Sequence, residues 1–406
     1  MMEIRKRTAT ALAFLLTGCM AGDEADEYAG GEVIREDSAS VSIVTDPRPS
    51  ADLSTYGVLD LIPSVVMGGV EGDGPHLFSG VGDVVSFPGG ELVVADASSR
   101  EVRVFTDDGD YRFTVGGPGD GPGEFTSIGR LRSLVGGRLA VWDDRSLRVS
   151  YFDSAGALEG THSVPEARGP WPALVEFLQD GRIVVGTHLL DEPEPRGSGW
   201  YPRVDSLIVR ILSADGTEEV PVGRFPGIDR AMTLEDLGGG RIIIRNPERP
   251  FAHRTHVSAS ESGVLVMRSD PFEIRSYGTA GNLEAIWRMP GLEEPLSPDE
   301  VSAYRSRVGD GSDGVAMMED LGTPTRRPPF RTAIVANDGL LWVKQYRSNP
   351  EADQTWWVIS QRGEVLGQLT VPASLEIRAV GEDRMVAVVE DELGVERIEA
   401  YEVRRP

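Results

Sequence analysis

The sequence GDGPGEF occupies residues 119–125, and a near-copy, GDGPHLF, occupies residues 72–78, 47 residues earlier. Downstream of each copy, at the same offset, come an apolar stretch, a glycine turn and a second apolar stretch, at residues 84–96 and 131–143. A repeat of this length is one supersecondary unit that cannot bury its apolar face alone. Several copies must therefore pack against one another.

The strand–turn–strand pattern occurs six times, with turns centred on Gly90, Gly137, Gly181, Gly263, Gly339 and Asp383. In most units a further turn follows that ends in glycine, as at residues 106–109 and 360–363, and then another strand-like stretch. Glycine at that position supplies the positive φ of a tight hairpin. Each unit is therefore predicted to be a four-stranded antiparallel meander.

The last unit reaches Pro406 where its outermost strand is expected to begin. The apolar stretch 58–67, before the first repeat, can supply this strand, close a ring and remove a free sheet edge. We therefore predict an all-β fold, a six-bladed β-propeller over residues 53–406 that an N-terminal strand closes. A two-sheet sandwich is the alternative, and the 47-residue self-similarity argues against it.

Two insertions interrupt the period, at about residues 224–252 and 293–330. In the second, Ser297, Pro298 and Glu300 have the spacing of a capping box, which predicts a short helix that ends near Val308. We expect both insertions to lie over one face of the ring, since insertions and function concentrate in such loops.

The N-terminus has the features of a targeting segment. A basic head at residues 5–7 precedes an apolar run, Ala9 to Leu16, that is too short to span a bilayer. The run ends just before Cys19, the only cysteine of the chain, and this ending resembles the bacterial lipobox. The resemblance implies that residues 1–18 are a signal peptide and that Cys19 is lipidated. An ordinary signal peptide beside a stray cysteine is the alternative.

Residues 19–52 begin with many acidic and small residues and few apolar ones, so we expect a flexible acidic tether. Met20, rather than aspartate, follows Cys19, which by analogy with bacterial lipoproteins favours the outer membrane or a periplasm-facing location. The implied partner is therefore a membrane, reached through the lipid anchor in the cell envelope. The mature domain has no cysteine pair, so its core must suffice without a disulfide.

The chain is acidic, with 65 Asp and Glu against 40 Lys and Arg and a formal net charge of −25. Nucleic acid is excluded as a partner because affinity for it depends on neutralising phosphates. Solubility is the simplest interpretation of this charge, and we expect a monomer.

The repeats are similar to those of the NHL-like six-bladed propellers, which include many bacterial envelope lipoproteins. The resemblance rests on residues 119–125, on PFAHR at 250–254 and on PFR at 329–331 leading to LWV at 341–343, and it covers about residues 55–403. It implies the fold but no single activity, since propellers include binders, scaffolds, lyases and lactonases.

Six positions, each seven residues before a turn centre, mark the start of the predicted innermost strands: Asp83, Arg130, Leu174, His256, Thr332 and Glu376. Five are polar, and in a propeller these strand ends surround the central channel. Convergent polar groups in a concave site predict ligand binding, although strand ends are often polar simply because they are solvated.

Arg254 and Arg331 follow the two insertions directly and could add a cationic rim that captures a carboxylate or phosphate. Arg326 and Arg327 lie close by in the sequence, and surface arginines that offset an acidic protein are the alternative. The predicted ligand site at the channel mouth comprises Asp83, Arg130, Arg254, His256, Arg331 and Glu376.

Other chemistries find less support. The glycine-rich 116–123 lacks the Gly-Lys-Ser/Thr of a phosphate loop, and there is no Gly-x-Ser-x-Gly nucleophile motif. His253 and His256 are three residues apart, so on a strand they point to opposite faces and make a poor metal pair.

Lactonase-like propellers hold a calcium-like ion with Glu, Asp and two Asn. The few asparagines here lie away from the channel positions, which leaves Asp83 and Glu376 as a cation pair. We therefore predict an envelope binding module, and a divalent-cation-dependent hydrolase or lyase with Ca²⁺ is the alternative.

Overall fold

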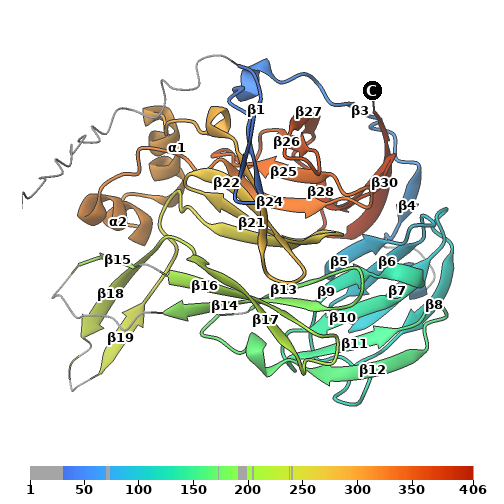
Figure 1. The fold of residues 1–406 in the computed structure, drawn as a ribbon. Coiled ribbons are helices and arrows are strands. Elements are labelled where there is room, and N and C mark those ends of the chain that lie inside the picture. The colour runs from blue at the N-terminus through green and yellow to red at the C-terminus, as the bar shows by residue number, and fades with distance from the viewer. Residues whose placement is uncertain are drawn as a thin grey trace, which may run out of the picture.

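The computed structural model describes residues 31–69, 74–171, 173–190, 199–203, 205–236, 238 and 241–405. Six sheets are arranged in a ring as blades, and a seventh, three-stranded sheet lies outside the ring, which confirms the six-bladed β-propeller (Figure 1). The predicted signal peptide 1–18, the predicted lipidation site Cys19 and the proline-rich residues 191–198 lie outside the described residues.

The first three blades follow the predicted repeat. Blade 1 contains β5 (Val81–Ser86), β6 (Leu92–Asp96), β7 (Glu101–Phe105) and β8 (Tyr111–Val115). Blade 2 contains β9 (Ile128–Ser133), β10 (Leu139–Asp143), β11 (Arg148–Phe152) and β12 (Leu158–Ser163). Blade 3 contains β13 (Leu174–Phe177), β14 (Ile183–Leu190), β16 (Asp205–Leu212) and β17 (Glu219–Pro226).

The other three blades differ in how their outer edges are completed. Blade 4 contains β20 (Thr255–Ala259), β21 (Gly263–Ser269), β22 (Phe272–Gly278) and β23 (Leu283–Arg288). Blade 5 contains β24 (Phe330–Val335), β25 (Leu341–Gln345), β26 (Gln354–Ile359) and β27 (Val365–Val371). Blade 6 has only three strands of its own, β28 (Glu376–Val380), β29 (Arg384–Glu390) and β30 (Glu396–Arg404).

The predicted N-terminal closure is present. β3 (Val58–Leu59) and β4 (Val65–Met67) both pair antiparallel with β30, Val58 opposite Arg404 and Met67 opposite Ile398. Met67 is 2% exposed and packs in the cluster between blades 6 and 1, whereas Val66, on the other face of the same strand, is 53% exposed. The closing strand therefore joins the last blade to the first through both hydrogen bonds and apolar burial.

The repeat quoted at the outset forms a structural corner between blades. Phe125, at the end of the 119–125 copy, is 1% exposed and packs in the cluster shared by blades 1 and 2. Asp143, at the end of β10, accepts hydrogen bonds from the Thr126 amide and from the Arg145 and Ser146 amides. The 119–125 copy thus fixes the entry of the chain into blade 2, and no phosphate loop forms there.

The expectation of a flexible tether over residues 19–52 is wrong for the part that the structure describes. β1 (Ile34–Ser38) and β2 (Val41–Thr45) form a hairpin, and β2 pairs in parallel with β23 at the outer edge of blade 4. The sequence of β2, VSIVT, is β-branched, and its Val44 is buried against blade 4. Ordered structure therefore begins well before residue 53.

The N-terminal segment continues around the outside of the ring. Asp46 is 1% exposed and accepts a hydrogen bond from the Val365 amide of blade 5. The Tyr56 amide then donates to the Gln368 carbonyl of β27 before the chain reaches blade 6. We call residues 34–67 the belt, because they contact the outer edges of blades 4, 5 and 6 in succession.

The insertions form a cap, defined as residues 199–203, 227–254 and 289–329. It contains the sheet β15 (Tyr201–Arg203), β18 (Arg230–Asp236) and β19 (Ile242–Arg245) and the helices α1 (Pro298–Val308) and α2 (Asp313–Leu321). These elements gather at one side of the ring in Figure 1, where α2 contacts β15. Trp200, Ala231 and Met317 form a small core between them, so the insertions support one another.

The predicted helix is confirmed as α1. Ser297 and Glu300 form the reciprocal capping box, with Pro298 at the first helical position. The second helix, α2, was not predicted, although Ser312 caps it by accepting a hydrogen bond from the Val315 amide. Among the described residues, no helix is long and apolar enough to cross a membrane.

Closure by β4 leads to a stability prediction. Met67→Ala should lower the free energy of unfolding by about 2–5 kcal/mol, because it removes a buried side chain and leaves a cavity between two blades. Val66→Ala, one residue away on the solvent face, should change it by less than about 0.5 kcal/mol. Urea unfolding of the two variants and the parent measures both values. Equal small effects would contradict the closing role of β4.

Candidate functional site

The candidate site is the central channel. The inner strands β5, β9, β13, β20, β24 and β28 contact one another in turn and close a ring around it. The structure places all six sequence-predicted positions in its lining: Asp83, Arg130, Leu174, His256, Thr332 and Glu376. The cavity has a volume of about 450 Å³, within the range of small-molecule sites. The cap emerges on the face at which these strands begin.

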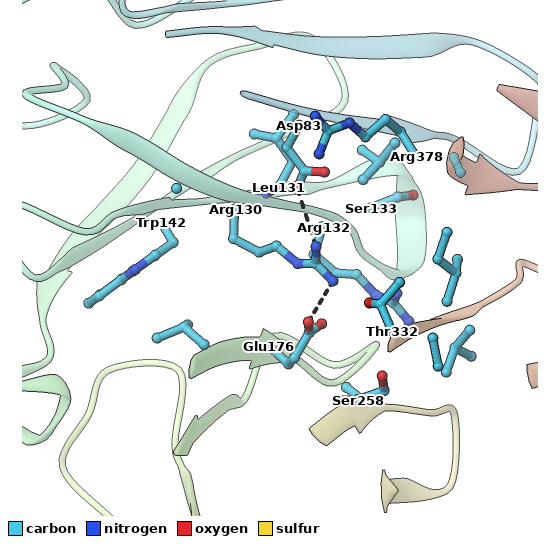
Figure 2. Close-up of a pocket in the computed structure, with 18 of the residues that line it drawn as sticks. Asp83, Arg130, Leu131, Arg132, Ser133, Trp142, Glu176, Ser258, Thr332 and Arg378 are labelled. Atoms are coloured by element: carbon cyan, nitrogen blue, oxygen red, sulfur yellow. Dashed lines mark hydrogen bonds and ion pairs between the residues drawn. The ribbon is translucent and has the colours of Figure 1, made fainter. Parts of the chain in front are cut away.

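Arg130 forms the central ion pair of the channel. Its Nη2 lies 2.5 Å from Glu176 Oε1, and its Nη1 lies 3.9 Å from Asp83 Oδ2 (Figure 2). Asp83 also accepts hydrogen bonds from the Leu131 amide at 2.8 Å and the Val84 amide at 3.0 Å. Three blades are thus joined through one guanidinium, which the two carboxylates hold in a fixed orientation.

Glu176 was missed by the sequence reasoning. It is 7% exposed on β13, whose sequence is LVEF, and burial raises the pKa of its carboxyl, while Arg130 and then Arg132 oppose this rise. A single acid in an otherwise apolar inner strand, two residues after Leu174, was the signal that could have found it. Residues i and i+2 of a strand share a face, so the whole strand face should have been considered.

Arg132 and Arg378 were also missed, and they carry the largest unmet hydrogen-bonding capacity of the channel. Within the described residues, the Nε atoms of both guanidiniums are buried without a hydrogen-bond partner. Burial lowers the pKa of Arg132, with Glu176 opposing and Arg130 adding to this effect. Arg378 Nη2 lies 3.1 Å from Glu376 Oε1. Both side chains line the channel (Figure 2).

His256 is held in its neutral form. Burial, followed by repulsion from Arg130, lowers the pKa of its imidazole to about 4. Its Nε2 lies 3.2 Å from Ser258 Oγ, another channel residue. At neutral pH His256 therefore contributes a polar, uncharged group beside the arginines.

The proposed cation pair has other partners. Asp83 is bonded to two amides and lies near Arg130, while Glu376 pairs with Arg378. Across the described ranges, no group of three or more His, Cys, Asp and Glu side chains is placed to hold a metal ion. Calcium binding by Asp83 and Glu376 stays a prediction, and the geometry favours hydrogen bonding and ion pairing.

Arg254 and Arg331 do not lie in the channel, so the predicted single site is wrong in this respect. They line a separate cavity between the cap and blades 4 and 5. Arg254 precedes β20, and Arg331 is the extra residue of a β-bulge in β24, which turns its side chain away from the channel face that Thr332 occupies.

The remaining sequence candidates have structural partners. Arg326 pairs with Glu293 at 2.5 Å, and Arg327 pairs with Glu300 at 3.3 Å, as expected for surface arginines in an acidic protein. His253 Nδ1 lies 2.9 Å from the Ser269 carbonyl oxygen. His253 and His256 therefore do not converge on one point.

The neutral state of His256 predicts a pH dependence. Its pKa is about 4 in the folded protein against an ordinary 6.5, so the unfolded chain binds the proton first as the pH falls. Stability from this group is present above pH 6.5 and is lost towards pH 4, by at most about 3 kcal/mol. His256→Gln should reduce the loss of melting temperature over this interval.

His162→Gln is the control, because His162 lies on the outer strand β12 rather than in the channel. Melting curves at pH 7 and at pH 4.5 compare the two variants with the parent. An unchanged pH slope in His256→Gln would show that the channel histidine does not titrate in this way.

Comparisons with known proteins support the fold. Residues 76–157 match the family model DUF5128, described as a 6-bladed beta-propeller. A member of the DUF4221 family from Bacteroides vulgatus is similar in structure, with a TM-score of 0.50 and 9% identity over 87% of this chain and 100% of that one. No curated protein matches the sequence.

Two further solved structures are similar at lower scores. A putative exported protein from Bacteroides fragilis has a TM-score of 0.47 and 12% identity, with 90% of this chain and 99% of that one covered. The calcium-binding protein regucalcin from Agrobacterium tumefaciens has a TM-score of 0.35 and 10% identity, with 87% and 98% covered. These likenesses concern the backbone fold, and they carry no argument about activity.

Proposed function

We propose that the protein is a lipid-anchored binding module of the bacterial cell envelope, and that its central channel holds a small polar ligand with an anionic group. The buried, unpartnered Nε of Arg132 is the observation that carries this proposal. An unsatisfied guanidinium costs folding free energy unless something else supplies the missing acceptor. A carboxylate ligand is such an acceptor, and it matches the planar fork of arginine.

The rest of the channel suits a ligand with both charged and neutral polar groups. Arg130 is already paired with Glu176, so Arg132 and the half-paired Arg378 remain for the anion. His256 and Ser258 are uncharged and can exchange hydrogen bonds with hydroxyl or amine groups. A volume of about 450 Å³ corresponds to about 15 water molecules, which suits a small metabolite rather than a peptide segment.

Arg132 leads to a paired prediction on stability and binding. Without ligand, Arg132→Met should leave the melting temperature unchanged or raise it, because a half-buried guanidinium whose Nε has no partner is replaced by an apolar chain of similar length. With ligand at a hundred times its Kd, the parent should gain about 2.7 kcal/mol, and the variant should bind about tenfold more weakly or worse.

Thermal melts against a panel of small carboxylates, amino acids and sugar acids measure both effects. Arg210→Gln is the control, because Arg210 forms its ion pair with Glu219 on the outer strands of blade 3. A large fall in melting temperature for ligand-free Arg132→Met would mean that Arg132 is structural and would remove the basis of the proposal. A rise that depends on Ca²⁺ and is lost in Asp83→Asn would instead favour the cation-dependent enzyme.

The lipid anchor rests on the sequence around Cys19, and the structure adds a constraint on reach. The belt begins at Ile34, and the first residue that the structure describes is Gly31. The 12 residues from Cys19 to Gly31 extend at most about 40 Å. The anchor we propose would therefore hold the propeller close to the membrane, with blade 4 leading.

The anchor can be tested by fractionation. The parent should partition with membranes and into detergent, because the proposed lipid chain buries its methylene groups in the apolar phase. Cys19→Ser should appear in the soluble fraction with an unchanged melting temperature. A Cys19→Ser protein that stays in the membrane fraction would contradict lipidation as the anchoring mechanism.

A further inference from the structure

Arg254 and Arg331 line a second cavity, apart from the channel, and its lining carries a different set of charged groups. It lies where the cap meets blades 4 and 5, and its volume is about 160 Å³. Its polar lining includes Arg249, Arg254, Arg331 and one carboxylate, Glu248, and its apolar wall includes Phe251 and Tyr346. Three guanidiniums beside one carboxylate are unusual in a chain whose net charge is −25.

The backbone directs Arg331 into this position. It is the bulged residue of β24, between the pairs Phe330–Gln345 and Thr332–Lys344. The corresponding bulges of blades 1 and 2 hold glycines, Gly82 and Gly129. A bulge points a side chain away from the regular pleat, so blade 5 places a guanidinium where blades 1 and 2 have no side chain.

The charges in this cavity are not balanced by the protein. Arg254 Nη2 pairs with Glu248 Oε2 at 2.9 Å, whereas the exposed Arg331 side chain forms no ion pair or hydrogen bond within the described part of the chain. Arg254 and Arg331 line the same small cavity, and burial lowers the pKa of Arg254, with repulsion from Arg331 adding to this effect. Lys344, next to Thr332 across the sheet, also has a lowered pKa, from burial first and from Arg347 and Arg331 as well.

We propose that this cavity binds a small oxyanion of the phosphate type between Arg254 and Arg331. Two guanidiniums of like charge repel each other unless an anion lies between them, and a phosphate can accept hydrogen bonds from both. The volume equals about five water molecules, which admits such an ion and little more. The hydroxyl of Tyr346, which burial keeps protonated by raising its pKa, adds a further donor to the cavity.

Binding there would also join the cap to the ring. Arg331 belongs to blade 5, and Arg254 immediately precedes the inner strand of blade 4. Phe251 and Tyr304, whose ring centroids are 5.3 Å apart, bring the two insertions together at the same cavity. An anion held by both arginines therefore stabilises the cap over the face at which the channel opens.

Isothermal titration with inorganic phosphate, on the purified full chain in a phosphate-free buffer, tests the proposal. The parent should bind phosphate, and Arg331→Gln should weaken binding about tenfold or more, since a charge-assisted donor pair is lost. Arg326→Gln is the matched control, because Arg326 is exposed, lies five residues before Arg331 in the sequence and pairs with Glu293 outside the cavity. It should bind phosphate as the parent does.

Arg132→Met, which alters the channel, should also leave phosphate binding unchanged, so the two sites are distinguished. Absence of phosphate binding by the parent at millimolar concentration would overturn the proposal. So would an affinity that Arg331→Gln does not change, or acetate that binds as tightly as phosphate.

Discussion

The pairing of the belt with β30 is the constraint on which the rest of this structure depends. Blade 6 has three strands from the C-terminal end of the chain, and β3 and β4 complete it from the N-terminal end. Without that pairing, blades 6 and 1 would lose the apolar contacts around Met67, and a sheet edge would be open. The channel, the order of the six inner strands and the position of the cap all presuppose a closed ring.

The belt makes this closure cooperative over half of the molecule. β2 adds a parallel strand to blade 4, Asp46 accepts the Val365 amide of blade 5, and Tyr56 bonds to β27 before the chain enters blade 6. Each contact is modest alone, because a single hydrogen bond contributes only about 1 kcal/mol. Together they bring the N-terminal segment across three blades, so the segment that leads to the proposed anchor is also part of the fold.

Packing of neighbouring blades creates the polarity of the channel. Asp83, Arg130 and Glu176 come from the consecutive blades 1, 2 and 3, whose inner strands lie side by side and bring them within ion-pair distance. The low dielectric of the interior strengthens such pairs but penalises any member left over. Among the described residues of the channel, the Nε atoms of Arg132 and Arg378 lack such a partner, and the ligand that we propose would supply an acceptor.

The cap also depends on contacts between segments that are far apart in the sequence. Insertions that leave the ring at different blades have little core of their own, and they share one around Trp200, Ala231 and Met317. Their packing leaves a cavity against blades 4 and 5, where the bulge at Arg331 adds a cation. The channel and this cavity lie on the same face, yet each has its own set of charges.

The sequence by itself determined the number of blades, the closing strand, helix α1 and the six channel positions, because local turns, apolar alternation and a fixed repeat length specify these features. It did not reveal the belt hairpin, since β1 and β2 have a partner only once blade 4 exists. Nor did it place Arg254 and Arg331 correctly: Arg254 lies just before β20 begins, and a bulge turns Arg331 away from the face that strand spacing assigns to it. Glu176, Arg132 and Arg378 carried a detectable signal as charges on inner strands, but the partner of Glu176, Arg130, comes from another blade. Which charges are paired and which are left unpaired is a property of tertiary structure, because distance and burial decide it.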